Sequence, residues 1–437
     1  MLAKGRHLKH IVHFGDQQVF PGATNYVCLL FLSQAGVDAC RFVRVDNLET
    51  WLQDFKGSEG IFPAEGIAAA GWNFTVGRGS AVIDRLRNGG KRLGDVASIF
   101  VGLQTSADRI YVLESLDKPR NGLVEVRSRD GLEWELETLF LRPFLSDLSL
   151  APFQKPLFSH WLVFPYWIRD GESQLVQVSD IRTQCPQLWK YLKRNEGELR
   201  GRESGKVDGP EWYGYIYRKN LTLFERPKLI VQVIAQSPRF AFDDSNLYFT
   251  GGGNGPYYGV RWLAADESRS LHYLQAILNS PISDYFIRQV STTFRGGYWS
   301  YGKRFIEQIP IVPSTSAQEV LIARLVNCLL WTNNYFKDHP MEKTERDPLM
   351  LGWWEQVLNG LIYELYFPDE LHSRGLRLFE LVAQQEKLPG LTVIAESERL
   401  SQLREGFEAV YATHHPLRGA LHTLRSLETV RIIEGAL

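Results

Sequence analysis

The chain has 437 residues, of which 44% are hydrophobic and 23% charged, which is ordinary for a globular protein of roughly two or three domains. The formal net charge is −1, which excludes a polycation, so any nucleic-acid surface has to be local. The four cysteines form no Cys-x-x-Cys pair, which argues against a zinc site or a disulfide framework and fits a reducing cytoplasm.

The first predicted elements are two short strands around a turn and, at residues 26–32, a continuous apolar run of strand length. The short strands centre on Ile11-Val12 and Val19-Phe20. The apolar run is typical of a strand buried on both faces of an α/β sheet. We therefore expect neighbouring strands that the preceding residues do not supply. No apolar run reaches about 18 residues and the N-terminus lacks the pattern of a signal peptide, so we expect no membrane segment.

Helical and strand patterns then alternate. Residues 80–92 predict a short helix that ends at Gly89-Gly90, and residues 93–312 predict a mixed, strand-rich region with one helix at 268–289. After Pro313, Ser316 and Glu319 have the spacing of a capping box, and apolar residues recur at helical intervals to the chain end. We place a domain boundary near residue 314.

The balance of basic and acidic residues differs between the middle segment and the helical tail. Residues 200–310 carry 14 Lys and Arg against 10 Asp and Glu, whereas residues 316–437 carry 12 against 17. An anionic partner is therefore expected on the middle segment and not on the helical tail.

Three stretches of the middle segment carry candidate binding residues. Cations at 218–228 precede an apolar strand, a glycine-rich loop lies at 249–258, and aromatic and basic residues interleave at 291–304. Such cations can neutralise phosphates, and interleaved aromatics can stack on bases. The alternatives are a solvated loop, a plain hairpin loop and a hairpin whose aromatics pack inward.

Catalytic and metal motifs are missing from the sequence. There is no Gly-x-Ser-x-Gly elbow, the His414-His415 pair has no partner at metal-ligand spacing, and no Glu-x-Lys follows Asp243-Asp244 as a metal-dependent nuclease would need. We therefore predict no catalytic residue and no metal ligand in this chain.

At this point the residues match a known family. Phe14-Gly15-Asp16, with the run at 26–32, resembles the end of the catalytic domain in adenine-specific DNA methyltransferases of the fused, type IIG-like restriction–modification kind. Residues 100–108 look like the opening of the TaqI-like C-terminal specificity domain, the target-recognition domain of that family. Residues 218–234, 277–280 and 296–311 resemble later segments of that domain in the same order, and residues 363–366 are similar to a recurring feature of the family's closing helices.

The family's catalytic motif, Asn/Asp-Pro-Pro-Tyr/Phe, does not occur here. In the family this motif and the glycine loop for S-adenosylmethionine precede the resembling region. The resemblance therefore implies that S-adenosylmethionine and the pocket for the flipped adenine belong to a catalytic segment or chain outside this sequence.

These observations predict an α+β protein. Residues 1–65 would be a remnant of a Rossmann-like methyltransferase sheet, 66–92 a linker, 93–313 a DNA target-recognition domain and 314–437 a helical domain. We expect a cytoplasmic, phage-defence protein whose partners are double-stranded DNA and a catalytic methyltransferase segment or chain. A free-standing specificity subunit and a structural component of a phage-defence complex stay open as alternatives. The predicted DNA contacts are Arg218, Lys219, Arg226, Lys228, Arg239, Asn254, Tyr257, Arg295, Tyr298, Lys303 and Arg304.

Overall fold

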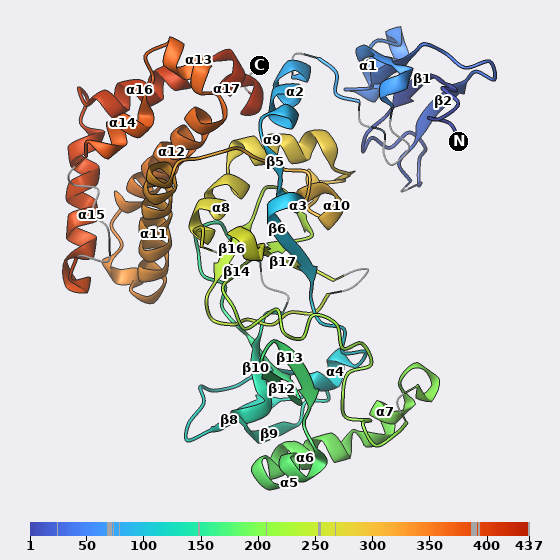
Figure 1. Cartoon of the computed structure of the whole chain (residues 1–437), viewed down its shortest axis with the longest axis vertical. Helices are drawn as coiled ribbons and strands as arrows, with labels where there is room; N and C mark the ends of the chain where they lie inside the picture. Colours follow the sequence, from blue (N-terminus) through green and yellow to red (C-terminus); the bar gives the residue numbers. More distant parts are fainter. Residues whose placement is uncertain are drawn as a thin grey trace.

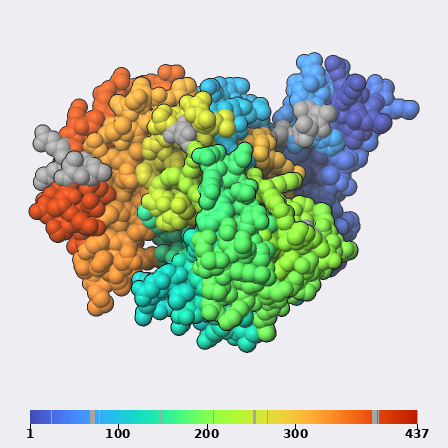
Figure 2. Space-filling view, turned by 60° about the horizontal axis from the view of Figure 1, so that its bottom comes forward, coloured from blue at the N-terminus to red at the C-terminus, as the bar shows by residue number. Residues whose placement is uncertain are grey.

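The computed structural model describes residues 1–435 apart from 24, 68–71, 73, 78, 147–148, 207, 252–254, 267, 386–390 and 392–393. The N-terminal sheet and the helical C-terminal region lie at opposite ends of the molecule (Figure 2). In the part of the chain that is described, no helix is both long and apolar enough to cross a membrane. Nor do the described His, Cys, Asp and Glu side chains gather in any group that would hold a metal ion.

A small sheet with the strand order β2-β1-β3-β4 opens the chain. Its strands are β1 (Leu8–His13), β2 (Cys28–Leu32), β3 (Ala39–Arg44) and β4 (Ser58–Pro63). β1 pairs in parallel with β3 and antiparallel with β2. Helix α1 (Leu48–Asp54) begins at Asn47, whose side chain accepts a hydrogen bond from the Thr50 N–H. The short strand expected at Val19-Phe20 does not form.

β2 lies at the edge of this sheet. The expected strand is present, but the prediction that it is buried on both faces is wrong for this chain. Leu29, Leu30, Phe31 and Leu32 are 44%, 43%, 48% and 52% exposed, because β1 is the only described strand that pairs with β2. Apolar side chains on both faces of an edge strand are therefore open to solvent, which natural edge strands usually avoid.

The segment after this sheet packs closely against the rest of the molecule. Helix α2 (Ser80–Asn88) ends before Gly89, as its sequence predicts. The Tyr285 phenol donates a hydrogen bond to the Gly79 carbonyl at 3.0 Å, and Arg85 forms an ion pair with Glu370 at 2.9 Å. The end of the expected linker is thus held against the segment that follows the central sheet, at Tyr285, and against the C-terminal helices, at Glu370.

A four-stranded antiparallel sheet forms the centre of the molecule (Figure 1). Its order is β16 (Phe240–Asp243), β14 (Lys228–Gln232), β17 (Tyr257–Trp262) and β6 (Ala97–Val101). Side chains alternate along β14, so Leu229 and Val231 join the core shared with the C-terminal helices, whereas Ile230 joins the core of the lower lobe. The central sheet is therefore buried on both faces.

The helix expected at 268–289 is two helices, α8 (Leu271–Leu278) and α9 (Pro281–Val290). Pro281 occupies the first turn of α9 and the Ser280 hydroxyl accepts from the Ser283 N–H, so a new helix begins there. Smaller elements border this region. They are α3 (Leu93–Val96), α10 (Lys303–Ile306), the pair β5 (Lys91–Arg92) with β20 (Pro310–Ile311), and the sheet of β15 (Ile234–Ala235), β19 (Tyr298–Ser300) and β18 (Thr293–Phe294).

The lower lobe in Figure 1 is built on a five-stranded antiparallel sheet. Its order is β10 (Leu141–Phe144), β11 (His160–Val163), β7 (Val112–Ser115), β8 (Leu123–Arg127) and β9 (Glu133–Glu137). The lobe also contains α4 (Asp108–Tyr111), the hairpin of β12 (Tyr166–Arg169) and β13 (Glu172–Leu175), α5 (Val178–Gln184), α6 (Pro186–Arg194), α7 (Glu196–Gly201) and the 3-10 turn η3 (Arg202–Gly205).

Helices make up the C-terminal region, as predicted. They are α11 (Ser316–Asp338), α12 (Asp347–Tyr366), α13 (Pro368–Ser373), α14 (Leu378–Ala383), α15 (Glu396–Tyr411), α16 (Pro416–Leu424) and α17 (Glu428–Ile433). The capping box at the start of α11 is Thr315 with Gln318, one residue earlier than expected, because Glu319 instead accepts hydrogen bonds from Arg269 and Ser314. The predicted fold class, α+β with a helical C-terminal region, is confirmed. The domain boundaries stay a proposal.

Candidate nucleic-acid interface

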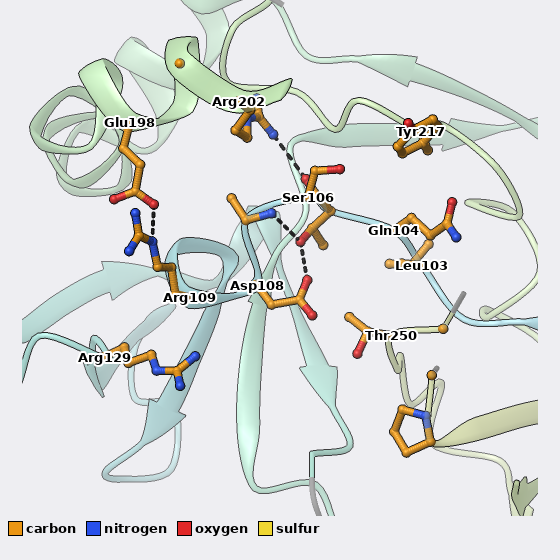
Figure 3. A pocket seen from close by; sticks show the side chains of 16 residues that line it. Leu103, Gln104, Ser106, Asp108, Arg109, Arg129, Glu198, Arg202, Tyr217 and Thr250 are labelled. Atoms are coloured by element: carbon orange, nitrogen blue, oxygen red, sulfur yellow. Dashed lines mark hydrogen bonds and ion pairs between the residues drawn. The ribbon is translucent and has the colours of Figure 1, made fainter. Parts of the chain in front are cut away.

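A cavity of about 1070 Å³ opens between the central sheet and the lower lobe. The loop of residues 103–109, the end of α7 and the chain around Thr250 form its walls. Figure 3 shows Arg109 and Arg129 at one end of this cavity and Gln104 and Tyr217 at the other. The cavity therefore joins side chains from segments far apart in the sequence.

Two glycines let the walls of the cavity meet backbone to backbone. The Leu103 N–H donates to the Phe249 carbonyl, and the Gly251 N–H donates to the Leu103 carbonyl, both at 2.9 Å. A Cβ atom on Gly251 would lie 2.2 Å from the nitrogen of Gly102, and one on Gly102 would lie 2.4 Å from the Phe249 carbonyl oxygen. Only glycine fits at these two positions, so the start of the loop 103–109 is fixed to the chain at 249–251.

A tight turn orients the loop 103–109. The Thr105 hydroxyl donates to the Asp108 carboxylate and accepts from the Ala107 N–H at 3.1 Å. Ser106, between them, has a φ of +58°, which is rare for a residue with a side chain. Such strain persists only where the surroundings impose it, and it is common at binding sites.

Arg202 fixes the same loop from behind. Its buried guanidinium donates to the carbonyls of Leu199, Thr105, Trp212 and Gly214 at 2.7, 3.1, 2.6 and 2.9 Å. These bonds join the loop, the end of α7 and the chain at 212–214. Burial also raises the pKa of Tyr111, which stays a neutral phenol and donates to the Gly214 carbonyl at 3.1 Å.

The exposed rim of the cavity carries charge of both signs. Arg109 forms an ion pair with Glu198, and the Tyr217 hydroxyl donates to Glu203 at 3.0 Å. Arg129 is exposed and forms no ion pair with a residue that the structure describes. Arg129 can therefore bind an anion without breaking an ion pair to a described residue.

The surface continues into two further cavities of about 570 Å³ each, and both are lined by Arg109 and Arg129. Arg127 and Arg194 contribute to one of them each. We call these four residues the arginine groove. Asp108, Glu114, Asp130 and Glu198 lie along it, so the groove presents acceptors as well as donors.

Several residues predicted from the sequence lie on the hairpin of β18 and β19 or on α10. Arg295, Tyr298, Lys303 and Arg304 are exposed there. Arg295 donates to the Ala23 carbonyl at 3.1 Å, and its N–H donates to the Tyr26 hydroxyl at 3.3 Å. In Figure 1 the hairpin region and α4 lie on the flank away from the C-terminal helices.

The cations at 218–226 have different surroundings. Arg218 forms an ion pair with Glu211, which keeps the pKa of Arg218 above its usual value although burial lowers it. Lys219 is exposed. Arg226 is exposed at a separate cavity. Asn254 lies outside the described residues.

Two of the predicted contacts, Lys228 and Tyr257, lie inside the protein, and a third, Arg239, is half-buried. Lys228 is 0% exposed and forms an ion pair with Asp243 at 2.5 Å, and Tyr257 is 2% exposed in the core of the lower lobe. Arg239 is half-buried and donates to the Ser149 hydroxyl at 2.6 Å. Since buried side chains do not reach a phosphate, we leave Lys228 and Tyr257 out of the interface that we propose.

None of the DNA contacts predicted from the sequence lies in the arginine groove. Three of its members, at 109–129, precede the segment in which positive charge was counted, and Arg194 lies just before residue 200. The spacing of Thr105 and Asp108, which forms a capped turn after Gly102, was the available signal. The role of Arg202 had no sequence signal, because an arginine that bonds to four carbonyls looks like any surface arginine.

Part of the chain matches a known protein family. Residues 184–311 match the TaqI-like C-terminal specificity domain. The chain is 25% identical over 325 residues to the type II restriction enzyme and methyltransferase RM.Eco57I of Escherichia coli, an alignment that covers 71% of this chain and 32% of that protein. It is 25% identical over 214 residues to the type II methyltransferase M.PaeR7I of Pseudomonas aeruginosa, covering 48% and 31%. The chain thus spans about a third of these relatives' length, and its recognised resemblance to type II restriction–modification methyltransferases is confirmed.

Two solved structures show weaker similarity. The type IIL restriction–modification enzyme MmeI, in complex with DNA, aligns over 94% of this chain and 47% of its own, with 12% identity and a TM-score of 0.42. The type IIG restriction endonuclease BpuSI aligns over 84% and 45%, with 13% identity and a TM-score of 0.33.

Proposed function

We propose that this chain reads the target sequence for a bacterial adenine-specific (N6) restriction–modification methyltransferase, and that another segment or chain supplies methyl transfer. The match of residues 184–311 to a specificity domain carries the proposal. Arg129 supports it, because it lines all three cavities of the arginine groove and forms no ion pair with a described residue, and a cation on a concave surface attracts phosphates.

The groove has the side-chain chemistry for both kinds of DNA contact. Arg129 and Arg109 would hold phosphates, which fixes the register of the duplex without reading its sequence. Gln104 and Asp108 line the same cavity and suit base edges, since an amide pairs with adenine and a carboxylate accepts from cytosine. The exposed residues Tyr298 and Lys303 would extend the interface along the same flank.

Selection from a random duplex pool tests this proposal. The chain should enrich one short motif, and its affinity for that motif should exceed its affinity for a scrambled duplex by at least about a thousandfold. If no motif is enriched at salt concentrations where the chain still binds DNA, the chain binds DNA without sequence specificity and the proposal is wrong.

We also propose that a catalytic segment completes the sheet at β2. A strand with apolar side chains on both faces belongs inside a sheet, and here Leu30 and Leu32 on one face and Leu29 and Phe31 on the other are about half exposed. A strand added along this edge would pair with its free backbone groups, and helices packed on the two faces of the completed sheet would cover the apolar side chains. The alternative, a free-standing specificity subunit, would use the same edge to dock a separate catalytic chain.

Two measurements test this arrangement. Incubation of the chain with labelled S-adenosylmethionine and DNA should give no label above background, because the sequence holds no Asn/Asp-Pro-Pro-Tyr/Phe motif. In sedimentation velocity the chain should self-associate through β2, and the double variant Leu30→Lys, Leu32→Lys should be monomeric. A wild-type chain that stays monomeric at high concentration would show that the edge needs no covering strand.

A further inference from the structure

The hairpin of β18 and β19 contacts the segment that connects β1 to β2 in the N-terminal sheet. The Arg295 guanidinium donates to the Ala23 carbonyl at 3.1 Å, and the Arg295 backbone N–H donates to the Tyr26 hydroxyl at 3.3 Å. Tyr298 faces Arg295's neighbour Phe294 across the hairpin. We call Tyr26, Arg295 and Tyr298 the hairpin joint.

The hairpin joint lies at one particular edge of the N-terminal sheet. β1 and β3 are parallel, so their carboxyl ends, at His13 and Arg44, lie at the same edge. β2 begins at that edge because Cys28 pairs with His13, and Tyr26 precedes Cys28 by two residues. In open α/β sheets, ligands bind outside the carboxyl ends of the parallel strands. The hairpin joint therefore borders the edge at which a completed methyltransferase sheet would receive its substrate.

Most aromatic side chains of the hairpin stretch are held within the protein. Tyr301 is 0% exposed, and Phe294 and Trp299 are half-buried. β19 also pairs with β15, so the base of the hairpin is anchored. Tyr298 differs, because it is 41% exposed. Among the described aromatic residues at 291–304, it is the one whose ring is open to a partner.

The tip of the hairpin has a fixed shape. Gly296 and Gly297 have φ values of +81° and +73°, which a residue with a Cβ atom rarely adopts. The Gln236 side-chain amide donates to the Gly296 carbonyl at 3.0 Å. An ordered tip presents the Tyr298 ring without the entropy cost of ordering a loop on binding.

Two cations border the exposed ring. Arg295 and Lys303 are exposed, and neither forms an ion pair with a residue that the structure describes. Lys303 begins α10, three residues after the end of β19. The partner of the Arg295 guanidinium is a carbonyl, which carries no charge, so the positive charge is not neutralised. A flat ring beside two cations suits a base together with the phosphates of its strand.

We propose that Tyr298 stacks on DNA at the step where a base has left the helix, and that Arg295 holds a neighbouring phosphate. The inference rests on the proposed function, since methylation of adenine requires the base to leave the duplex. The departed base leaves a gap between its neighbours, and an aromatic ring that enters this gap stacks on a base. The position of Tyr298, beside the edge where the base would be received, suits it to this role.

Fluorescence anisotropy with two labelled duplexes of one sequence tests the inference. One duplex is fully paired, and the other carries a tetrahydrofuran abasic site, which stands for the position of the departed base. The abasic site is moved one position at a time through the sequence that selection enriches, or through a random sequence if none is enriched. At one position the full chain should bind the abasic duplex about tenfold more tightly than the paired duplex, as expected for one stacked base.

Tyr298→Ala should abolish this preference while its affinity for the paired duplex and its melting temperature stay at the wild-type values, because the side chain is exposed. Tyr298→Phe should keep the preference, since it keeps the ring. Phe158→Ala removes a ring of similar exposure, 40%, from the lower lobe and is the matched control. Arg129→Ala should weaken binding to both duplexes alike and leave the ratio of the two affinities unchanged.

The ratio of affinities and the absolute affinity separate this inference from the proposed function. A wild-type chain that binds both duplexes equally at every position, or a Tyr298→Ala variant that keeps the preference, overturns the inference and leaves the proposed function standing. A chain that binds neither duplex contradicts the proposed function and the inference with it.

Discussion

Lys228 was predicted to contact DNA, but it is a buried residue that forms an ion pair within the protein. Its ammonium donates to Asp243 at 2.5 Å and to the Phe224 carbonyl at 2.8 Å, and burial lowers its pKa against the influence of Asp243. Asp243 also accepts from the Leu247 N–H at 3.0 Å. The pair therefore fixes the turn after β16.

Replacing Lys228 by Ala should lower the free energy of unfolding by about 3–5 kcal/mol, because Asp243 would keep a buried charge without its partner. Urea denaturation measures this loss. The exposed Lys219→Ala variant should stay within about 0.5 kcal/mol of wild type. A stable Lys228→Ala protein with weakened duplex binding would instead return Lys228 to the interface.

Arg202 positions the loop 103–109, so its variant is tested by hydrogen exchange of that loop as well as by affinity for DNA. A lysine cannot reproduce the planar fork that reaches the carbonyls of Leu199, Thr105, Trp212 and Gly214. Arg202→Lys should weaken duplex binding about tenfold and speed hydrogen exchange at residues 103–109, while exchange in α11 stays the same. Equal acceleration in α11 would indicate global destabilisation and no specific effect on the loop.

At the scale of elements, α12 offers a pH-dependent contact. Asp347, its first residue, accepts from Arg404 at 2.7 and 2.9 Å and from the Thr344 N–H at 2.6 Å. Burial acts to raise the pKa of Asp347, but these hydrogen bonds outweigh it and the pKa is lowered. The carboxylate therefore stabilises the fold above its unfolded pKa of about 4, and the contribution is lost as the pH falls through the lower folded value.

Asp347→Asn should accordingly reduce stability at pH 7, and the difference from wild type should shrink below about pH 4. Urea denaturation at pH 7 and pH 3 measures it, with the exposed Asp369→Asn on α13 as control. A difference that is the same at both pH values would mean that the carboxylate charge is not what holds α12 to α15.

Local signals in the sequence predicted most elements but not their surroundings. The helix at 80–88 and the strand at 28–32 follow from hydrophobic pattern and flanking glycines. The exposure of β2 and the break at Pro281 did not, because the first depends on which other segments pack around the strand and the second on a capping serine that interrupts the helical periodicity. The hairpin residues Arg295 and Tyr298 were found because aromatic and basic residues alternate there, whereas Arg129 lies in the stretch Arg127-Ser-Arg-Asp130, which has no interleaved aromatic residue.

At the scale of the whole molecule, the two lobes share the central sheet. One face of β14 packs into the core of the C-terminal helices and the other into the core of the lower lobe. The arginine groove lies on the lower lobe, beside the ends of β6 and β17. Thus the helical region packs against the central sheet and contributes no described lining residue to the cavities of the arginine groove.

Arg129 should contribute to DNA binding without contributing to stability. Arg129→Ala should weaken binding to all duplexes alike and reduce the slope of log affinity against log salt by about 0.9, the value for one phosphate contact. The melting temperature should not change, since the side chain is exposed and forms no ion pair with a described residue. Lys118→Ala, exposed on the same lobe, is the control.

Fluorescence anisotropy of a labelled duplex across a salt series tests the central claim most directly. The triple variant of Arg109, Arg127 and Arg129 to Ala should lose at least about a hundredfold in affinity and two to three units of salt slope, roughly 0.9 per phosphate contact. The variant of Arg374, Arg377 and Arg425 to Ala removes the same charge from the helical flank and should bind as wild type does. Equal losses in both variants, or none in the first, would contradict the assignment of the arginine groove as the DNA-binding surface.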